Sequence, residues 1–149
     1  MLTSKAKYGL KALLYLTTYR DRAVQGAEIA EEQRIPKKFL DAILLQLKND
    51  GMLTSRKGKG GGYRLAQQPE AITIGRVVRL LDGPVAPIAC VSRTAYRRCD
   101  DCQDEASCGI RQVMQQVRDQ IAAVLDSTSV ADMHAREAAG GQYIPMYEI

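Results

Sequence analysis

Apolar residues near the start of the chain recur at intervals of three and four, the spacing of amphipathic helices. This spacing predicts helices over residues 3–20 and 27–33 and a third between Pro36 and Gly51. Proline is tolerated in the first turn of a helix, and glycine is typical directly after the last turn. A short middle helix that is tightly joined to a third helix predicts a helix-turn-helix.

Two short strands are predicted after this motif, over residues 53–56 and 63–65, with the cationic, glycine-rich tip 57–62 between them. A β-hairpin in this place is typical of the wing of a winged helix-turn-helix. A further amphipathic helix begins after Thr73, whose hydroxyl is expected to cap it, and ends at Gly83.

The C-terminal half has a different pattern. Residues 83–107 show no regular spacing, whereas a long amphipathic helix is predicted from Cys108 to Asp126. Ser129 with Asp132 resembles a capping box that opens a last short helix.

The long helix carries an apolar stripe that a small winged domain does not need. Its members are Ile110, Val113, Val117, Ile121 and Val124. The stripe packs either on the chain's own core or on the same stripe of a second copy. We favour the second copy because palindromic DNA sites require two-fold symmetric readers.

These elements predict a mainly α fold with a small β-hairpin wing, in which a winged helix-turn-helix precedes a long C-terminal dimerisation helix. They divide the chain into a DNA-binding domain (1–82), a cysteine-bearing sensor loop (83–108) and a dimerisation helix with the C-terminal tail (109–149). The tail 140–149 is apolar in patches and is expected to dock on the body.

Charge is distributed unevenly along the chain. The net charge of the 149 residues is +4, but residues 1–82 hold 15 Lys and Arg against 8 Asp and Glu, and residues 83–149 hold 6 against 9. A basic N-terminal half indicates a polyanionic partner, although a solvated basic surface has the same composition.

The sequence has no run of about 18 apolar residues and no signal-peptide cleavage pattern, so we expect a cytoplasmic protein without a membrane partner. In a reducing compartment, clustered cysteines indicate metal or redox chemistry before structural disulfides. The glycine-rich tip lacks the GK[ST] ending of a nucleotide-binding P-loop. Paired catalytic histidines or acids are also absent from the sequence, so we expect no enzyme.

The start of the third helix and the wing hold residue types that contact DNA. The second helix of a helix-turn-helix presents its N-terminal residues to the major groove. Lysine contacts phosphate or guanine, aspartate accepts from a cytosine amino group and repels phosphate, and wing cations suit a narrow minor groove. The expected DNA-binding residues are Lys37, Lys38, Phe39, Asp41, Arg56, Lys57, Lys59, Gly60, Gly61 and Arg64.

All the cysteines of the chain fall within a short segment and are expected to surround one metal centre. They are Cys90, Cys99, Cys102 and Cys108. Thiolates select zinc, copper(I) or iron–sulfur clusters. An iron–sulfur cluster is preferred because the wide gaps differ from the paired CxxC knuckles of zinc ribbons. Structural zinc, a thiol–disulfide switch and free buried cysteines stay as alternatives.

Four segments match a known family: LTSKAKYGLKAL at residues 2–13, LLQLKNDGMLTSRKGKGGGYRLA at 44–66, ITIGRVVRLLDGP at 72–84 and VLDSTSVADM at 124–133. With them the chain resembles the Rrf2 family of bacterial winged-helix regulators over nearly its whole length. The resemblance implies a homodimeric transcription regulator, usually a repressor. Family members with cysteines carry a 2Fe–2S or 4Fe–4S cluster that senses iron, cluster supply, nitric oxide or redox state. By position, the resemblance implies that Lys38, Phe39 and Asp41 meet DNA and that Lys57 enters the minor groove.

The chain departs from the family in its cysteine spacing. Typical members have C-x5-C-x5-C, but here eleven residues separate Cys90 from Cys102, with Cys99 between them. Members also recruit a fourth ligand, either a histidine three residues after the last cysteine or an acidic residue early in the first helix. Arg111 holds the first of these positions, and a lysine and a tyrosine occupy the second. Cys99 is therefore expected to be the fourth ligand.

We therefore expect a homodimeric regulator that binds a palindromic operator in double-stranded DNA. Loss or oxidation of the cluster is expected to change how the wings sit on the dimer. The alternatives are a CymR-like regulator controlled by a protein partner or thiol oxidation, a zinc-structured regulator, and a small redox protein. The last alternative leaves the wing and the helix-turn-helix unexplained.

Overall fold

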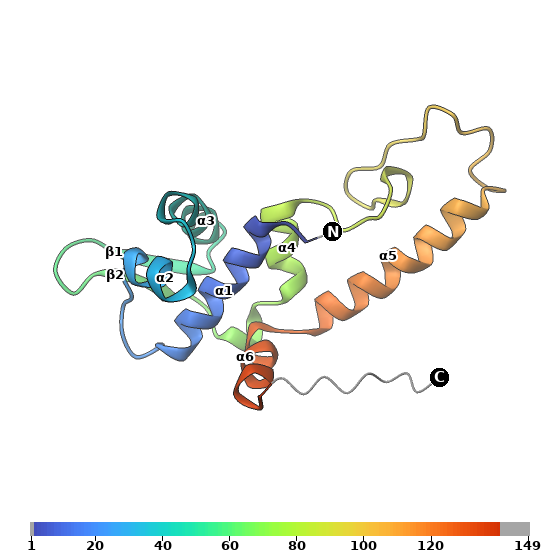
Figure 1. Ribbon diagram of the computed structural model, residues 1–149. Coiled ribbons are helices and arrows are strands. Elements are labelled where there is room, and N and C mark those ends of the chain that lie inside the picture. The colour runs from blue at the N-terminus through green and yellow to red at the C-terminus, as the bar shows by residue number, and fades with distance from the viewer. Residues whose placement is uncertain (1, 141–149) are drawn as a thin grey trace.

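The computed structural model describes residues 2–140 and has the mainly α architecture with one hairpin that the sequence predicts (Figure 1). The helices are α1 (Ser4–Thr18), α2 (Gly26–Gln33), α3 (Lys37–Asn49), α4 (Ile74–Asp82), α5 (Gly109–Ser127) and α6 (Val130–Ala138). The strands are β1 (Leu53–Arg56) and β2 (Gly62–Leu65), and short 3-10 turns occur at η1 (Pro69–Ala71) and η2 (Ala89–Val91). The predicted docking of the C-terminal tail concerns residues 141–149, which lie outside the described part.

Local signals set the ends of the helices, as predicted. The Thr73 hydroxyl accepts a hydrogen bond from the Arg76 amide at the start of α4. Gly83 follows the end of α4 with a φ of 90°, and Gly51 stands just beyond α3 with a φ of 82°. Side chains with a Cβ rarely adopt these angles, so glycine makes both chain reversals inexpensive.

Helices α1 to α4 enclose an aliphatic core. The predicted inward faces are confirmed, and the buried residues of α3 and α4 include Leu40, Ile43, Leu44, Leu47, Ile74, Val77, Val78 and Leu81. Burying a side chain of this kind contributes about 1.5–3 kcal/mol to the free energy of unfolding. The core therefore fixes α3 relative to its neighbours without using any residue of its exposed face.

Helix α6 returns to this body after α5 and packs on α1. Its first residue, Val130, is buried in the core, and the predicted capping box of Ser129 and Asp132 is present. Residues Thr73 and Ser129 form an isolated antiparallel bridge, in which Ile74 N donates to Thr128 O at 2.9 Å. The body that carries α3 and the wing therefore includes residues from both ends of the described chain.

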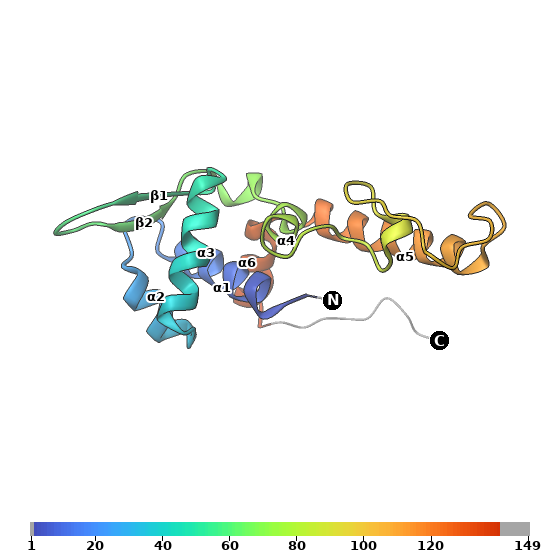
Figure 2. The same cartoon turned by 90° about the horizontal axis from the view of Figure 1, so that it is seen from above.

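Helix α5 extends away from the body toward the cysteine loop, which lies at the opposite end of the molecule from the hairpin (Figures 1 and 2). No residue of α5 is fully buried in the described chain. The apolar stripe is exposed, at 69% for Ile110, 54% for Val113, 38% for Val117, 40% for Ile121 and 61% for Val124. The described residues of a single chain therefore do not cover this stripe.

An ion pair joins the C-terminal part of α5 to α4. Arg79 donates from Nη1 to Asp126 Oδ1 at 2.5 Å and from Nη2 to Oδ2 at 2.9 Å. The hydrogen bonds from Arg79 hold the pKa of the Asp126 carboxyl below its ordinary value. A Cβ on Gly75 would lie 1.9 Å from Asp126 Oδ1, so the close approach of α5 to α4 requires glycine there.

Gly9 is the position where α1 packs most closely on Leu81 of α4, so an added side chain would have to displace Leu81. An ideal Cβ on Gly9 would lie 2.3 Å from Leu81 Cδ1, and Leu81 is itself in the core. We expect Gly9→Ala to lower the free energy of unfolding by about 1 kcal/mol net, because overpacking outweighs the better helix propensity of alanine. Urea unfolding measures this as a lower midpoint at an unchanged slope. Gly109→Ala is the matched control, since a Cβ there meets nothing within 4 Å, and an equal loss in both variants would contradict the packing argument.

Candidate nucleic-acid interface and cysteine cavity

The N-terminal end of α3 presents the residues that the sequence singled out. Lys37, Lys38, Phe39 and Asp41 are all exposed. Pro36 precedes the helix, and among the described residues no side chain caps it and no acidic residue stands in its first turn. The first amide groups and the positive end of the helix dipole are therefore left for an anion.

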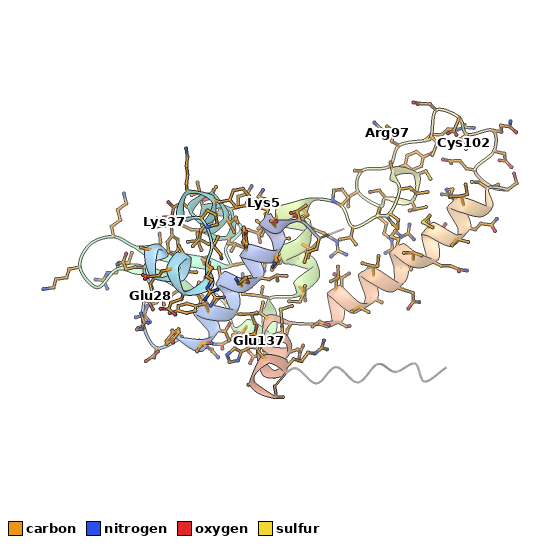
Figure 3. All side chains as sticks on the ribbon, viewed as in Figure 1. Lys5, Glu28, Lys37, Arg97, Cys102 and Glu137 are labelled. Atoms are coloured by element: carbon orange, nitrogen blue, oxygen red, sulfur yellow. The ribbon has the colours of Figure 1, made fainter. Side chains whose placement is uncertain are left out.

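Two side-chain contacts organise this end of α3. Lys37 Nζ lies 2.6 Å from Asp41 Oδ1, one turn later (Figure 3). The ring of Phe39 meets that of Tyr8 on α1 edge-on, with centroids 5.9 Å apart, yet Phe39 stays 46% exposed. Tyr8 was missed by sequence reasoning, because only the tertiary packing of α1 on α3 brings the two rings together.

The wing is the two-stranded sheet β1–β2, in which Leu53 faces Leu65 and Arg56 faces Gly62. Figure 2 shows it extending away from the helices. A Cβ on Gly61 would lie 2.2 Å from Arg56 O, and one on Gly62 would lie 2.5 Å from Val24 O. Both glycines thus let the hairpin close on itself and on the segment before α2.

The cations of the wing surround this hairpin on its exposed side. Arg56, Lys57, Lys59 and Arg64 are all exposed, and a surface hollow of about 240 Å³ is lined by Arg56, Gly60, Gly62 and Arg64 with Ala23, Thr54 and Ser55. A further cation, Arg34, stands in the turn before α3 with a φ of 53°. Sequence reasoning missed Arg34. Its position at the end of α2 has a positive φ, which glycine usually marks in a sequence, and here an arginine holds it.

The cysteines occupy three different settings in the loop. Cys90 lies in η2 and is 5% exposed, Cys99 is exposed, and Cys102 follows in a tight turn, where its amide donates to Cys99 O at 3.2 Å. Cys108 is the N-cap of α5, and its Sγ accepts from the Arg111 amide at 3.4 Å. Three of the cysteines thus lie on irregular backbone or a short 3-10 turn, and the fourth lies at the start of α5.

All four cysteines line a single cavity of about 400 Å³. Hydrogen bonding with Cys90, together with burial and neighbouring negative charges, raises the pKa of the Cys99 thiol above its ordinary value. The cavity also contains Arg111, whose Nε is buried and has no hydrogen-bond partner among the described residues. Thiol donors and an orphaned N–H around one cavity fit a sulfur-rich, thiolate-ligated group.

The thiols are not gathered into a finished metal site. Within residues 2–140, no three His, Cys, Asp or Glu side chains stand close enough together to hold a metal ion as they are. The loop that carries Cys99 and Cys102 is mostly exposed, so little packing holds its thiols in place.

Polar contacts attach the cavity to α5. Arg118, with a side chain only 12% exposed, donates from Nη1 to Val91 O at 2.6 Å and also pairs with Asp119. Arg93 reaches the same carboxylate at 3.2 Å, and these two arginines help hold the pKa of Asp119 below its ordinary value. The turn that holds Cys90 is thereby fixed to the middle of α5.

A helix-turn-helix followed by a basic wing defines a winged-helix DNA-binding regulator. A family model named Rrf2 and described as an iron-dependent transcriptional regulator matches residues 2–136. The chain belongs to the Rrf2 family of transcriptional regulators, as the sequence predicted.

Relatives support the same class. An rrf2-like HTH-type transcriptional regulator of Rhodobacter capsulatus is 45% identical over 91% of this chain and 93% of its own. The HTH-type regulator IscR of Aliivibrio salmonicida is 29% identical over 89% of this chain and 76% of its own. These relatives are regulators of transcription rather than enzymes.

Solved structures include relatives of two kinds. The chain is similar to CymR, the global cysteine regulator of B. subtilis, with a TM-score of 0.75 and 28% identity over 91% of this chain and 96% of the other. It is also similar to T. potens IscR, with a TM-score of 0.73 and 26% identity over 99% and 94% of the two chains. The predicted winged-helix fold is thus confirmed.

Among the residues that the structure describes, no helix is both long and apolar enough to span a bilayer. The cytoplasmic location stays a prediction from the sequence.

Proposed function

We propose that this DNA-binding regulator is a homodimeric repressor whose affinity for a palindromic operator is set by an iron–sulfur cluster held by Cys90, Cys99, Cys102 and Cys108. The observation that carries the proposal is the single cavity lined by all four cysteines at the start of α5. In this scheme residues 1–82 bind DNA, residues 83–108 sense, and residues 109–149 provide the dimer contact.

The proposed DNA contacts follow from exposure and charge. Lys37 and Lys38 contact phosphate or guanine, and Phe39 meets the methyl group of thymine. Asp41, held by Lys37 in the free protein, accepts from a cytosine amino group or repels a wrong base pair. In the wing, Lys57 and the other exposed cations enter the minor groove, whose potential is most negative in A·T-rich DNA. These are Arg56, Lys59 and Arg64. The exposed Gly60 lets the backbone approach DNA closely, and the buried Gly61 contributes by closing the hairpin that carries it.

When bound, the cluster would be a group whose charge and integrity respond to iron, redox state or nitric oxide. The chain holds the cluster with four thiolates, and contacts between elements couple the ordering of the loop to the position of α5. Arg118 links the turn of Cys90 to α5, and Asp126 links α5 to α4 through Arg79. An ordered loop therefore fixes the direction of α5, and with it the separation of two wings in a dimer.

The proposed dimer contact is the apolar stripe of α5. Its members stand three and four residues apart on one face of the helix, and the described chain leaves each of them at least 38% exposed. A stripe with this spacing is typical of helices that pair along their length.

A regulator controlled by thiol oxidation is the second candidate. The observation in its favour is that Cys90 and Cys99 line the same cavity and that Cys90 contributes to the raised pKa of the Cys99 thiol. A zinc-structured regulator uses the same four thiols and is separated from both by its metal content.

Anaerobic purification tests the cluster. We expect a coloured protein with iron and sulfide in equal amounts, whose visible absorption bleaches in air or nitric oxide. Cys99→Ser should lose most of this absorption because it removes one of four ligands, whereas Gln103→Ala, on the same cavity wall, should keep it. A colourless wild-type protein with stoichiometric zinc, or with no metal, would contradict the proposal.

Salt-dependent binding tests the DNA contacts. We expect Lys37→Ala to weaken binding to all DNA sequences alike and to reduce the slope of log affinity against log salt by about 1, because one phosphate contact is lost. Arg136→Ala removes the same charge from α6, away from α3 and the wing, and should leave the slope unchanged. Equal slopes for Lys37→Ala and the wild type would refute the assignment.

Sedimentation equilibrium tests the dimer. We expect Val117→Glu to raise the dimer dissociation constant at least about a hundredfold, or about 2.7 kcal/mol, because two carboxylates would be buried at a symmetric contact. Gln116→Glu adds the same charge beside the stripe and should remain dimeric. The stripe is not the dimer contact if Val117→Glu associates like the wild type.

A further inference from the structure

The orphaned nitrogen of Arg111 is the most costly unsatisfied group in the cysteine cavity. Its Nε is one of two buried side-chain polar atoms without a partner among the described residues. A buried donor without an acceptor costs about 1–3 kcal/mol, and more when it is charged. Such a group in a folded protein calls for an acceptor that the apolar and backbone surroundings do not supply.

Two of the three carboxylates that line the same cavity are already engaged by other residues. Asp104 accepts from the Ser107 hydroxyl and from the amides of Ser107 and Ala106, while Glu105 accepts from the Tyr96 hydroxyl. Arg111 forms no ion pair among the described residues. The remaining acceptors of the cavity are the Asp101 carboxylate and the more numerous sulfur atoms of the four cysteines.

The helix fixes Arg111 beside one of these sulfurs. Cys108 caps α5, and the amide of Arg111 donates to its Sγ at 3.4 Å. Residues three apart lie on the same face of a helix, so the Arg111 side chain leaves α5 on the face that carries Cys108. The backbone of Arg111 is thus bonded to a sulfur, while its side chain lines the cavity that all four sulfurs share.

We propose that Arg111 donates a hydrogen bond from Nε to sulfur in this cavity: to a cysteine thiolate that the exposed loop brings within reach in the metal-free protein, and to the sulfur of the held cluster when one is present. The second half rests on the proposed function; the first half does not. A cation that donates to anionic sulfur stabilises the more negatively charged state. Arg111 therefore raises the reduction potential of the held group and slows its loss.

Arg111→Ala in the full-length protein tests this after anaerobic reconstitution with iron and sulfide. We expect the variant to bind iron and sulfide in the wild-type ratio but to show a lower reduction potential, shifted Fe–S stretching bands in resonance Raman spectra, and release to a chelator that is about ten times faster. Arg111→Lys keeps the charge but not the Nε position, so its reduction potential should fall between those of the wild type and Arg111→Ala.

Arg97→Ala is the matched control. Arg97 lies in the same loop but outside the cavity (Figure 3), so its removal changes the net charge equally without removing the donor. Equal potentials, Raman bands and release rates in Arg111→Ala and the wild type would overturn the proposal. Equal shifts in Arg97→Ala and Arg111→Ala would reduce it to a general charge effect and also overturn it.

Metal-free protein separates this proposal from the proposed function. Alkylation of the thiols by iodoacetamide at neutral pH should be several-fold slower in Arg111→Ala than in the wild type or Arg97→Ala, because the donor that stabilises thiolate is gone. If the wild type binds no iron and sulfide, the cluster fails and the alkylation rates still decide the role of Arg111. If a cluster binds but neither its potential nor the alkylation rates respond, only the role of Arg111 fails.

Discussion

The attachment of α5 to the winged-helix body is the constraint on which the rest of the structure depends. Helix α5 has no fully buried residue in the described chain and is connected to the body at its C-terminal part. The connection includes the Arg79–Asp126 ion pair, the close approach at Gly75 and the bridge between Thr73 and Ser129. Leu125 of α5 also packs, partly buried, against the core. An α-helix is stiff along its axis, so a small change at this joint moves the distant cysteine end by a larger distance.

The strength of this joint differs from that of the core. The side chains of Arg79 and Asp126 are 39% and 48% exposed, and exposed ion pairs contribute no more than about 1 kcal/mol. The aliphatic core under α3 is far more stable, since each of its larger side chains contributes more than this pair. A signal of a few kcal/mol at the cysteine loop can therefore redirect α5 while α3 and the wing stay folded.

The features that the sequence predicted correctly are local ones. The stripe of α3, the cap at Thr73 and the capping box at Ser129 depend on residues within one or two helical turns, and each was readable from spacing and residue type. The contact of Tyr8 with Phe39 and the link from Arg118 to Val91 join segments far apart in the chain. No periodicity encodes such pairs, because they exist only once the helices have packed. For the same reason the sequence located the four cysteines but not the buried nitrogen that faces them.

The separation of the wing from the cysteine loop also gives each chain an electric dipole moment. Lysines and arginines surround the hairpin at one end, whereas the cysteine loop at the other end has as many arginines as acids, since Arg93, Arg97, Arg98 and Arg111 balance Asp100, Asp101, Asp104 and Glu105. In the field of a polyanion such a molecule experiences a torque that turns its basic wing toward the polyanion before any contact forms. The uncharged cysteine end then points away from the polyanion, so the two ends of one chain meet different surroundings from the start of the encounter.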